Sequence, residues 1–270
     1  MATTKVTSGL RTFTPSEGQV AVLSKAGAYT IVSGDYGATI NVTAAATMTL
    51  PDAATVGSGW WCRVRRPALA GGTNVTVSRA GTDTIAFGSD GTETSLLLAG
   101  DGDYVDVVSD GANWVATGNI TVALNVYSGW PNPVTQSVPS ATITTLEFNS
   151  INRDTHSGFN VSTFEYTVPL SGAYNIRGVV GVETQASDFV TWLYMQSNGS
   201  AVENAEKHIA VDTAFLAEDH IDMTATTVYD KGDVLTVAVQ HNRTGSINFT
   251  PSADNPNMNY WTIYRVGNRW

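Results

Sequence analysis

Carboxylates and one histidine at strand-like spacing are the residues of this sequence that could bind a metal ion. Glu218, His220 and Asp222 occupy every second position, so an extended strand would place their side chains on one face. Oxygen and nitrogen ligands of this kind suit a divalent cation. The same pattern is also typical of a solvated strand face or loop. We favour that interpretation, so no metal site is predicted.

A second group of acids surrounds Gly102 and comprises Asp101, Asp103, Asp106 and Asp110. Their order does not match that of an EF-hand calcium loop. Aspartate is favoured in turns because its carboxylate accepts hydrogen bonds from nearby backbone N–H groups. We therefore predict turn structure here rather than a calcium site.

Arginines next to a pair of tryptophans form the main candidate binding patch. Strand alternation would place Trp61, Arg63 and Arg65 on one face, with Cys62 and Val64 on the other. Guanidinium groups pair with carboxylates, so this face could bind an acidic protein surface or an anionic sugar. The alternative is a solvent face on which arginine stems cover apolar surface. Cys62 is predicted to point inward as a small hydrophobic residue.

No motif for catalysis is present in the sequence. G-x-S-x-G, H-E-x-x-H, the Walker A loop and Cys-x-x-Cys are all missing, and Gly57-Ser-Gly59 lacks the third glycine of a dinucleotide-binding loop. We therefore predict no catalytic residue, no cofactor and no enzymatic activity. A polysaccharide-degrading protein remains an alternative, because a pair of catalytic carboxylates has no sequence signature among so many acids.

The composition narrows the class of protein further. Of the 270 residues, 42% are hydrophobic, only 14% are charged and one is cysteine, which predicts short half-buried strands without a disulfide framework. The net charge of −10 gives no long-range attraction for nucleic acids or anionic membranes. We see no signal peptide and no apolar run long enough to span a membrane, so we expect synthesis in a bacterial cytoplasm.

Turn signals at regular intervals indicate an all-β first half. Asp90-Gly91, Asp101-Gly102 and Asp110-Gly111 recur about every ten residues, the spacing of successive hairpins. We predict a small β-sandwich or barrel-like domain over residues 21–120. Residues 1–20 lack apolar periodicity and are predicted to be an arm that a partner orders.

Two motifs in this half are similar to a β-domain of bacteriophage tail and head-fibre proteins. Thr49–Val64 contains LP-x-A-x-x-VG-x-GW, and Val108–Val115 contains SDG-x-x-W. The resemblance spans residues 29–118 and implies attachment to a virus particle. The particle-contact candidates are Arg11, Phe13, Trp61, Arg63 and Arg65.

A stiff connector is predicted over residues 121–133, because Trp130 lies between Gly129 and Pro131. Beyond it, in residues 134–270, four motifs resemble the C1q/TNF-like jelly roll. They are Tyr166-Thr-Val-Pro-Leu-Ser-Gly-Ala-Tyr174, Trp192–Gly199, Tyr229–Val237 and Tyr260–Tyr264. The last of these lacks the family's usual F-S-G-like sequence.

This resemblance implies a compact homotrimer without catalysis. An exposed aromatic last strand would be a liability in a single chain, which also favours a central seam between copies. The trimer-interface candidates are Tyr166, Tyr174, Tyr260, Trp261 and Tyr264.

Together these patterns predict an all-β, two-domain, non-enzymatic surface protein of a bacteriophage virion. A capsid-decoration or head-fibre protein is favoured, because no long shaft separates the two halves. The alternative is a short tail fibre that binds a host-surface glycan or protein. The expected partners are other copies of the chain and the major capsid protein or another virion protein. A bacterial surface or spore-coat trimer fits the phage-like first half less well.

Overall fold

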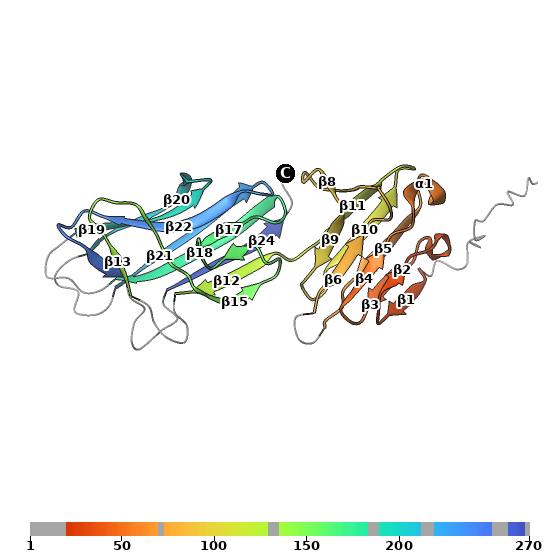
Figure 1. Ribbon diagram of the computed structural model, residues 1–270, viewed down its shortest axis with the longest axis horizontal. Coiled ribbons are helices and arrows are strands. Elements are labelled where there is room, and N and C mark those ends of the chain that lie inside the picture. The colour runs from red at the N-terminus through yellow and green to blue at the C-terminus, as the bar shows by residue number, and fades with distance from the viewer. Residues whose placement is uncertain are drawn as a thin grey trace, which may run out of the picture.

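The computed structural model describes residues 20–69, 73–128, 135–182, 189–211, 219–249 and 259–267. Two β-sandwiches lie one after the other along its long axis (Figure 1). Helical structure in these ranges is limited to a 3-10 turn, η1 (Ser33–Asp35), and one short helix, α1 (Ala53–Val56). No helix among the described residues is long and apolar enough to cross a membrane. The all-β prediction is confirmed.

The first sandwich packs a seven-stranded sheet on a four-stranded one. The larger sheet has the order β1 (Val22–Lys25), β3 (Thr39–Val42), β5 (Trp61–Arg65), β10 (Tyr104–Ser109), β11 (Trp114–Asn119), β7 (Ile85–Phe87), β8 (Thr92–Glu93). The smaller sheet has the order β2 (Tyr29–Thr30), β4 (Ala46–Thr49), β6 (Val75–Ser78), β9 (Ser95–Leu98).

The first six strands of this sandwich are parallel within each sheet and do not form hairpins. The chain alternates between the sheets from β1 to β6, so β1, β3 and β5 pair in parallel, as do β2, β4 and β6. Asp90-Gly91 and Asp110-Gly111 do close antiparallel hairpins. Asp101-Gly102 does not, because β9 before it pairs with β6 while β10 after it pairs with β5 and β11. The prediction of a hairpin at this middle turn was wrong.

The second sandwich also has two main sheets. One has the order β15 (Ser150–Asp154), β12 (Ala123–Tyr127), β24 (Tyr260–Gly267), β18 (Gly172–Val182), β21 (Asp219–Tyr229). The other has the order β16 (Phe159–Asn160), β17 (Glu165–Thr167), β22 (Val234–His241), β19 (Phe189–Ser197), β20 (Ser200–Val211), with β14 (Thr144–Thr145) also paired to β22. A small ladder joins β13 (Gln136–Val138) to β23 (Ile247–Phe249).

The strand order of the second sandwich is that of a jelly roll. Neighbours within each sheet are far apart in the chain, as in β12–β24–β18–β21 and β17–β22–β19–β20, and these pairs are antiparallel. The predicted jelly roll is therefore confirmed. The second sandwich begins earlier than expected, because β12 lies inside the predicted connector 121–133 and pairs with β24. Trp130 and its neighbours lie outside the described residues.

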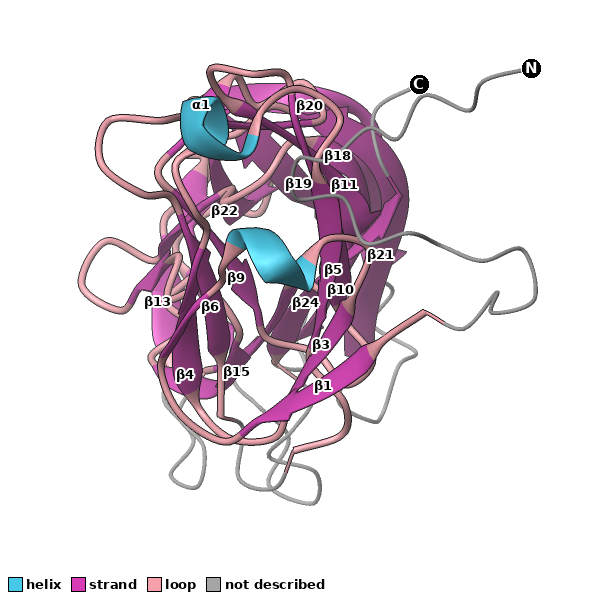
Figure 2. Cartoon of the chain, turned by 90° about the vertical axis from the view of Figure 1, so that its right-hand side faces the viewer, coloured by secondary structure: helices cyan, strands magenta, loops and turns pink. Residues whose placement is uncertain are grey.

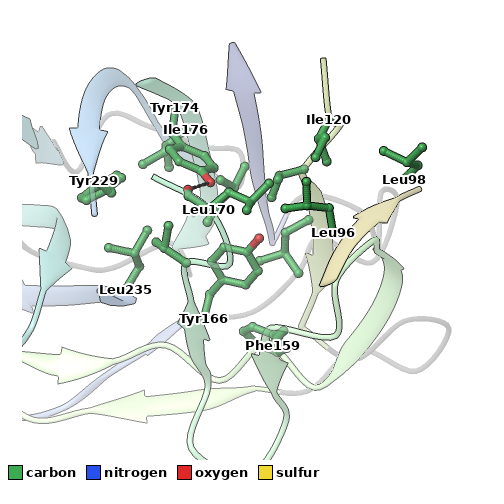
Figure 3. Packing of buried hydrophobic residues seen from close by; sticks show 14 of the residues in the cluster. Leu96, Leu98, Ile120, Phe159, Tyr166, Leu170, Tyr174, Ile176, Tyr229 and Leu235 are labelled. Carbon is green, nitrogen blue, oxygen red and sulfur yellow. Dashed lines mark hydrogen bonds between the residues drawn. The ribbon is translucent and has the colours of Figure 1, made fainter. Parts of the chain in front are cut away.

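The buried residues of the two sandwiches form one continuous cluster. Figure 3 shows Leu96 and Ile120 of the first sandwich close to Leu170 of the second. One buried carboxylate lies where the chain passes from the first sandwich to the second. Asp103 accepts hydrogen bonds there from Ala99 N, Gly100 N, Thr121 N and Thr121 Oγ1 at 2.7–3.1 Å.

Polar contacts hold the junction from the outside. Ser171 N donates to Asp90 Oδ1 at 2.6 Å, and Lys231 forms an ion pair with Glu93. These contacts connect the β7–β8 hairpin of the first sandwich to loops of the second. The two sandwiches therefore present their outer faces in a fixed relation to each other.

Candidate self-association face

Three of the five trimer-interface candidates lie in the interior of the second sandwich. Tyr166, Tyr174 and Trp261 are fully buried within the single chain, so they cannot contact a neighbouring copy. The Trp261 ring packs against Tyr166 and two phenylalanines, with centroids 5.9–6.4 Å apart. The prediction was wrong for these three residues, because strand alternation turns them toward the core.

The motif that carried the C1q/TNF resemblance is explained by packing of the fold. The Tyr174 hydroxyl donates to the carbonyl of Leu170, which fixes the turn between β17 and β18 (Figure 3). A side chain at Gly172 would overlap the carbonyl oxygen of Gly267. Burial raises the pKa of Tyr166 and of Tyr174, as expected for phenols inside a core.

The two remaining candidates point away from the core on the opposite face of the same sheet. Tyr264 is 40% exposed, and Tyr260 is half-buried. Register places Tyr260 between Tyr127 of β12 and Val179 of β18, and the Tyr127 and Tyr260 rings are 6.3 Å apart. We call the outer surface of β12, β24, β18 and β21 the tyrosine face.

The charges described on the tyrosine face cancel. Arg177 of β18 pairs with Asp222 of β21 at 2.6 Å, and its guanidinium lies 5.6 Å from the centroid of the Tyr260 ring. The hydrogen bond from Arg177 to the Asp222 carboxylate raises the pKa of the guanidinium. Other residues on this side that have exposed surface are uncharged, among them Asn125, Thr262, Asn175, Thr224, Thr226 and Val228. This neutral surface with aromatic rings suits contact with another protein.

The alternative of a metal site rests on Glu218, His220 and Asp222, and the structure describes the side chain of Asp222 alone. Asp222 is engaged by Arg177, while Glu218 and the side chain of His220 lie outside the described residues. Among the side chains that are described, no group of three or more metal-binding residues comes together.

The face predicted on β5 of the first sandwich is confirmed in its geometry. Trp61, Arg63 and Arg65 point outward, and Cys62 and Val64 are buried. Burial raises the pKa of the Cys62 thiol, which therefore stays protonated at neutral pH. Arg11 and Phe13 lie outside the described residues.

The charge of Arg63 is satisfied within the chain. Its guanidinium makes two hydrogen bonds of 2.7 Å to Asp106 on the neighbouring strand β10 and lies 4.4 Å from the centroid of the Tyr104 ring. Its pKa is raised, chiefly by the hydrogen bond to Asp106. An acidic partner would therefore find Arg65 rather than Arg63 available for pairing.

The acids around Gly102 each have a local structural role. Asp101 pairs with the buried Arg66 at 2.6 Å, and this bond lowers the pKa of the Asp101 carboxyl. Asp110 accepts hydrogen bonds from Ala112 N and Asn113 N in its turn, which lower its pKa. Asp106 pairs with Arg63, and Asp103 accepts hydrogen bonds at the junction, so each of the four acids has a partner within the chain.

The two motifs of the first half, Thr49–Val64 and Val108–Val115, meet inside the first sandwich. Trp60 of the first motif stacks edge-on against the buried Trp114 of the second, with centroids 5.6 Å apart. The Ser109 hydroxyl donates to the carbonyl of Ala53 at 3.0 Å, and Asp52 caps the N-terminus of α1. The inward residues of both motifs therefore encode the packing of this domain, while Trp61, Val108 and Val115 of the same motifs point outward.

Comparison with known proteins finds likeness in structure alone. No family model and no curated protein matches the chain. The chain is similar to the structure of Eiger TNF from S. frugiperda, with 10% identity, 56% of this chain and 95% of that chain covered, and a TM-score of 0.40. It is also similar to murine APRIL, with 11% identity, coverages of 54% and 99% and a TM-score of 0.39. The globular domain of zebrafish complement 1qA protein is similar as well, with 11% identity, 55% of this chain and 99% of that chain covered, and a TM-score of 0.37. These scores add no argument to the strand order, which carries the jelly-roll assignment.

Proposed function

We propose that this protein is a non-enzymatic, self-associating structural protein of a bacteriophage virion. Within that class we propose a capsid-decoration or head-fibre protein with an outward second sandwich. The tyrosine face is the observation that carries self-association. Its partly exposed aromatic rings and internally paired charges lower the cost of desolvation when a second copy covers it.

A homotrimer is the assembly that we propose, because the four motifs of the second sandwich resemble a family of trimeric knobs. A closed ring of three copies would bury every tyrosine face without leaving an open end that could grow into a filament. Substituting Tyr264 by Asp tests the surface, since it places an unpaired charge within the contact. We expect this variant to dissociate at concentrations at which the unaltered chain is assembled.

Placement on a phage particle is supported by the two motifs of the first sandwich, and the predicted arm supplies the attachment. Deleting residues 2–20 should abolish occupancy of the particle while the remaining chain keeps its assembly state. Occupancy that does not change would contradict this role of the arm. Saturable binding of the full-length, labelled protein to host cells, with no binding to particles lacking it, would instead favour a tail fibre with a glycan or protein receptor.

A further inference from the structure

An exposed apolar stripe crosses three strands of the first sandwich. Val108 of β10 pairs in register with Trp61 of β5 on one side and with Val115 of β11 on the other, so the three residues form one row across the sheet. Val108 is 41% exposed and Val115 is 48% exposed. The ring of Tyr36, also exposed, lies 6.4 Å from that of Trp61 and widens the row. We call these four residues the Trp61 stripe.

The two charges in the next row of the same strands are already paired. Arg63 and Asp106 form the next row of the same sheet and bind each other through two hydrogen bonds. The whole chain carries a net charge of −10, so two copies repel each other at long range. Copies approach most easily through faces that expose apolar surface and carry no unpaired acid. The Trp61 stripe and its flanking row meet both conditions.

The stripe lies on the same side of the molecule as the tyrosine face. Figure 2 looks along the long axis and shows β3, β5 and β10 of the first sandwich on the same side as β18, β21 and β24 of the second. The junction contacts of Asp90 with Ser171 and of Glu93 with Lys231 hold the sandwiches together. A neighbouring copy seated on one face therefore extends along the other.

We infer that the Trp61 stripe is covered by a second copy of this chain, so that the interface between copies runs along both sandwiches. The inference rests on the proposed self-association and assigns the stripe to a neighbouring copy in place of a capsid protein. The predicted arm is then left as the attachment to the particle.

Substitution of Val115 by Asp in the full-length chain tests this inference. The side chain is exposed in the single chain, so the variant should fold, and unchanged far-UV circular dichroism and melting temperature verify that. We expect the dissociation constant of the assembly, from a dilution series in sedimentation velocity, to rise by about tenfold or more. Val161→Asp is the matched control, because Val161 is 44% exposed in the turn between β16 and β17, outside both faces.

The outcomes separate this inference from the proposed function. If Val115→Asp assembles like the unaltered chain while Tyr264→Asp dissociates, the inference is overturned and self-association through the tyrosine face stands. If Val115→Asp assembles normally but no longer binds particles, the stripe belongs to a virion partner and the inference is again overturned. If the unaltered chain is monomeric at every concentration, both proposals fail.

A second measurement does not depend on weakening the assembly. Cys62 is buried, so a cysteine introduced as Val115→Cys can be spin-labelled selectively. The inference predicts a strong dipolar coupling between labels on different copies, and a much weaker one from Val161→Cys. Equal, weak couplings from both positions would place the stripe on the outside of the assembly and overturn the inference.

Discussion

The two sandwiches differ in how their strands are connected, yet their outer faces carry the same arrangement. The first begins with strands that pair in parallel, and the second is an antiparallel jelly roll. On each, an outward arginine lies near a tyrosine ring and pairs with an aspartate on the adjacent strand. The groups are Arg63, Tyr104 and Asp106 on one face, and Arg177, Tyr260 and Asp222 on the other.

In each sandwich, core-forming side chains and outward contact residues alternate along the same strands. Motif residues such as Trp114 and Trp261 point inward and determine each fold. The outward residues between them determine what each face can bind. An exposed ion pair contributes little stability by itself, so neutralising the face is the role that we assign to both pairs.

The largest effect is expected from removing a tryptophan of either core. Trp114→Ala and Trp261→Ala should each cost about 3–5 kcal/mol in the free energy of unfolding, because both side chains are fully buried. Since one apolar cluster joins the sandwiches, calorimetry should show each variant lowering a shared unfolding transition. Two separate transitions, each sensitive to only one variant, would show that the sandwiches unfold independently.

Asp103→Ala should be the next most damaging change, at about 2–3 kcal/mol, because it leaves several buried donors at the junction without an acceptor. Urea denaturation measures the loss. Asp110→Ala is the control, since Asp110 serves an exposed turn of the first sandwich alone. Equal losses from both variants would remove the special role of Asp103 in joining the two regions.

Gly172→Ala should destabilise the second sandwich by about 1–3 kcal/mol, because the added methyl group overlaps the Gly267 carbonyl and the Arg265 side chain. Gly27→Ala in the first sandwich is the matched control, as nothing lies within 4 Å of its Cβ position. Thermal melts of both variants compare the effects. A Gly172 variant as stable as the control would contradict the close packing of this motif.

Neutralising the acid of either outer ion pair tests whether the two faces behave alike. Asp106→Asn and Asp222→Asn should each change the free energy of unfolding by less than about 1 kcal/mol, since both pairs are partly exposed. Each should nevertheless weaken self-association, because an arginine is left unpaired within the contact. If only Asp222→Asn weakens it, the two faces are not equivalent.

The smallest effect concerns His156 near the junction, where burial lowers the pKa of the imidazole below its ordinary 6.5, against the opposing influence of Asp154 and Asp103. The unfolded chain then binds more protons than the folded one just below pH 6.5, so stability is full above that pH and declines as the pH falls. His156→Gln should reduce the change in melting temperature between pH 7.5 and 5.5. An identical change in the variant would exclude His156 as its source.

Strand alternation predicted which residues face the interior more reliably than it predicted the partners of each strand. Cys62 and Val64 point inward as expected. Residues 123–127 looked like part of a connector, because the strand that pairs with them lies near the other end of the chain. Pairing over such a distance leaves no local signal in the sequence.

The site candidates show a second limit. The aromatic character of Trp261 and Tyr166 predicted an interface, although strand alternation places both side chains in the core. The sequence did not predict the outward neighbours Tyr127, Arg177 and Asp222 as interface residues. Their value depends on adjacent strands that only the folded chain brings together.

Self-association through the tyrosine face is tested most directly by the mass of the intact protein in solution, measured by light scattering during size-exclusion chromatography. The account predicts a mass three times the 28.6 kDa of one chain, and a shift to the mass of one chain for Tyr264→Asp. A single-chain mass for the unaltered protein across the accessible concentrations would contradict the account and leave the outer aromatic residues without a partner.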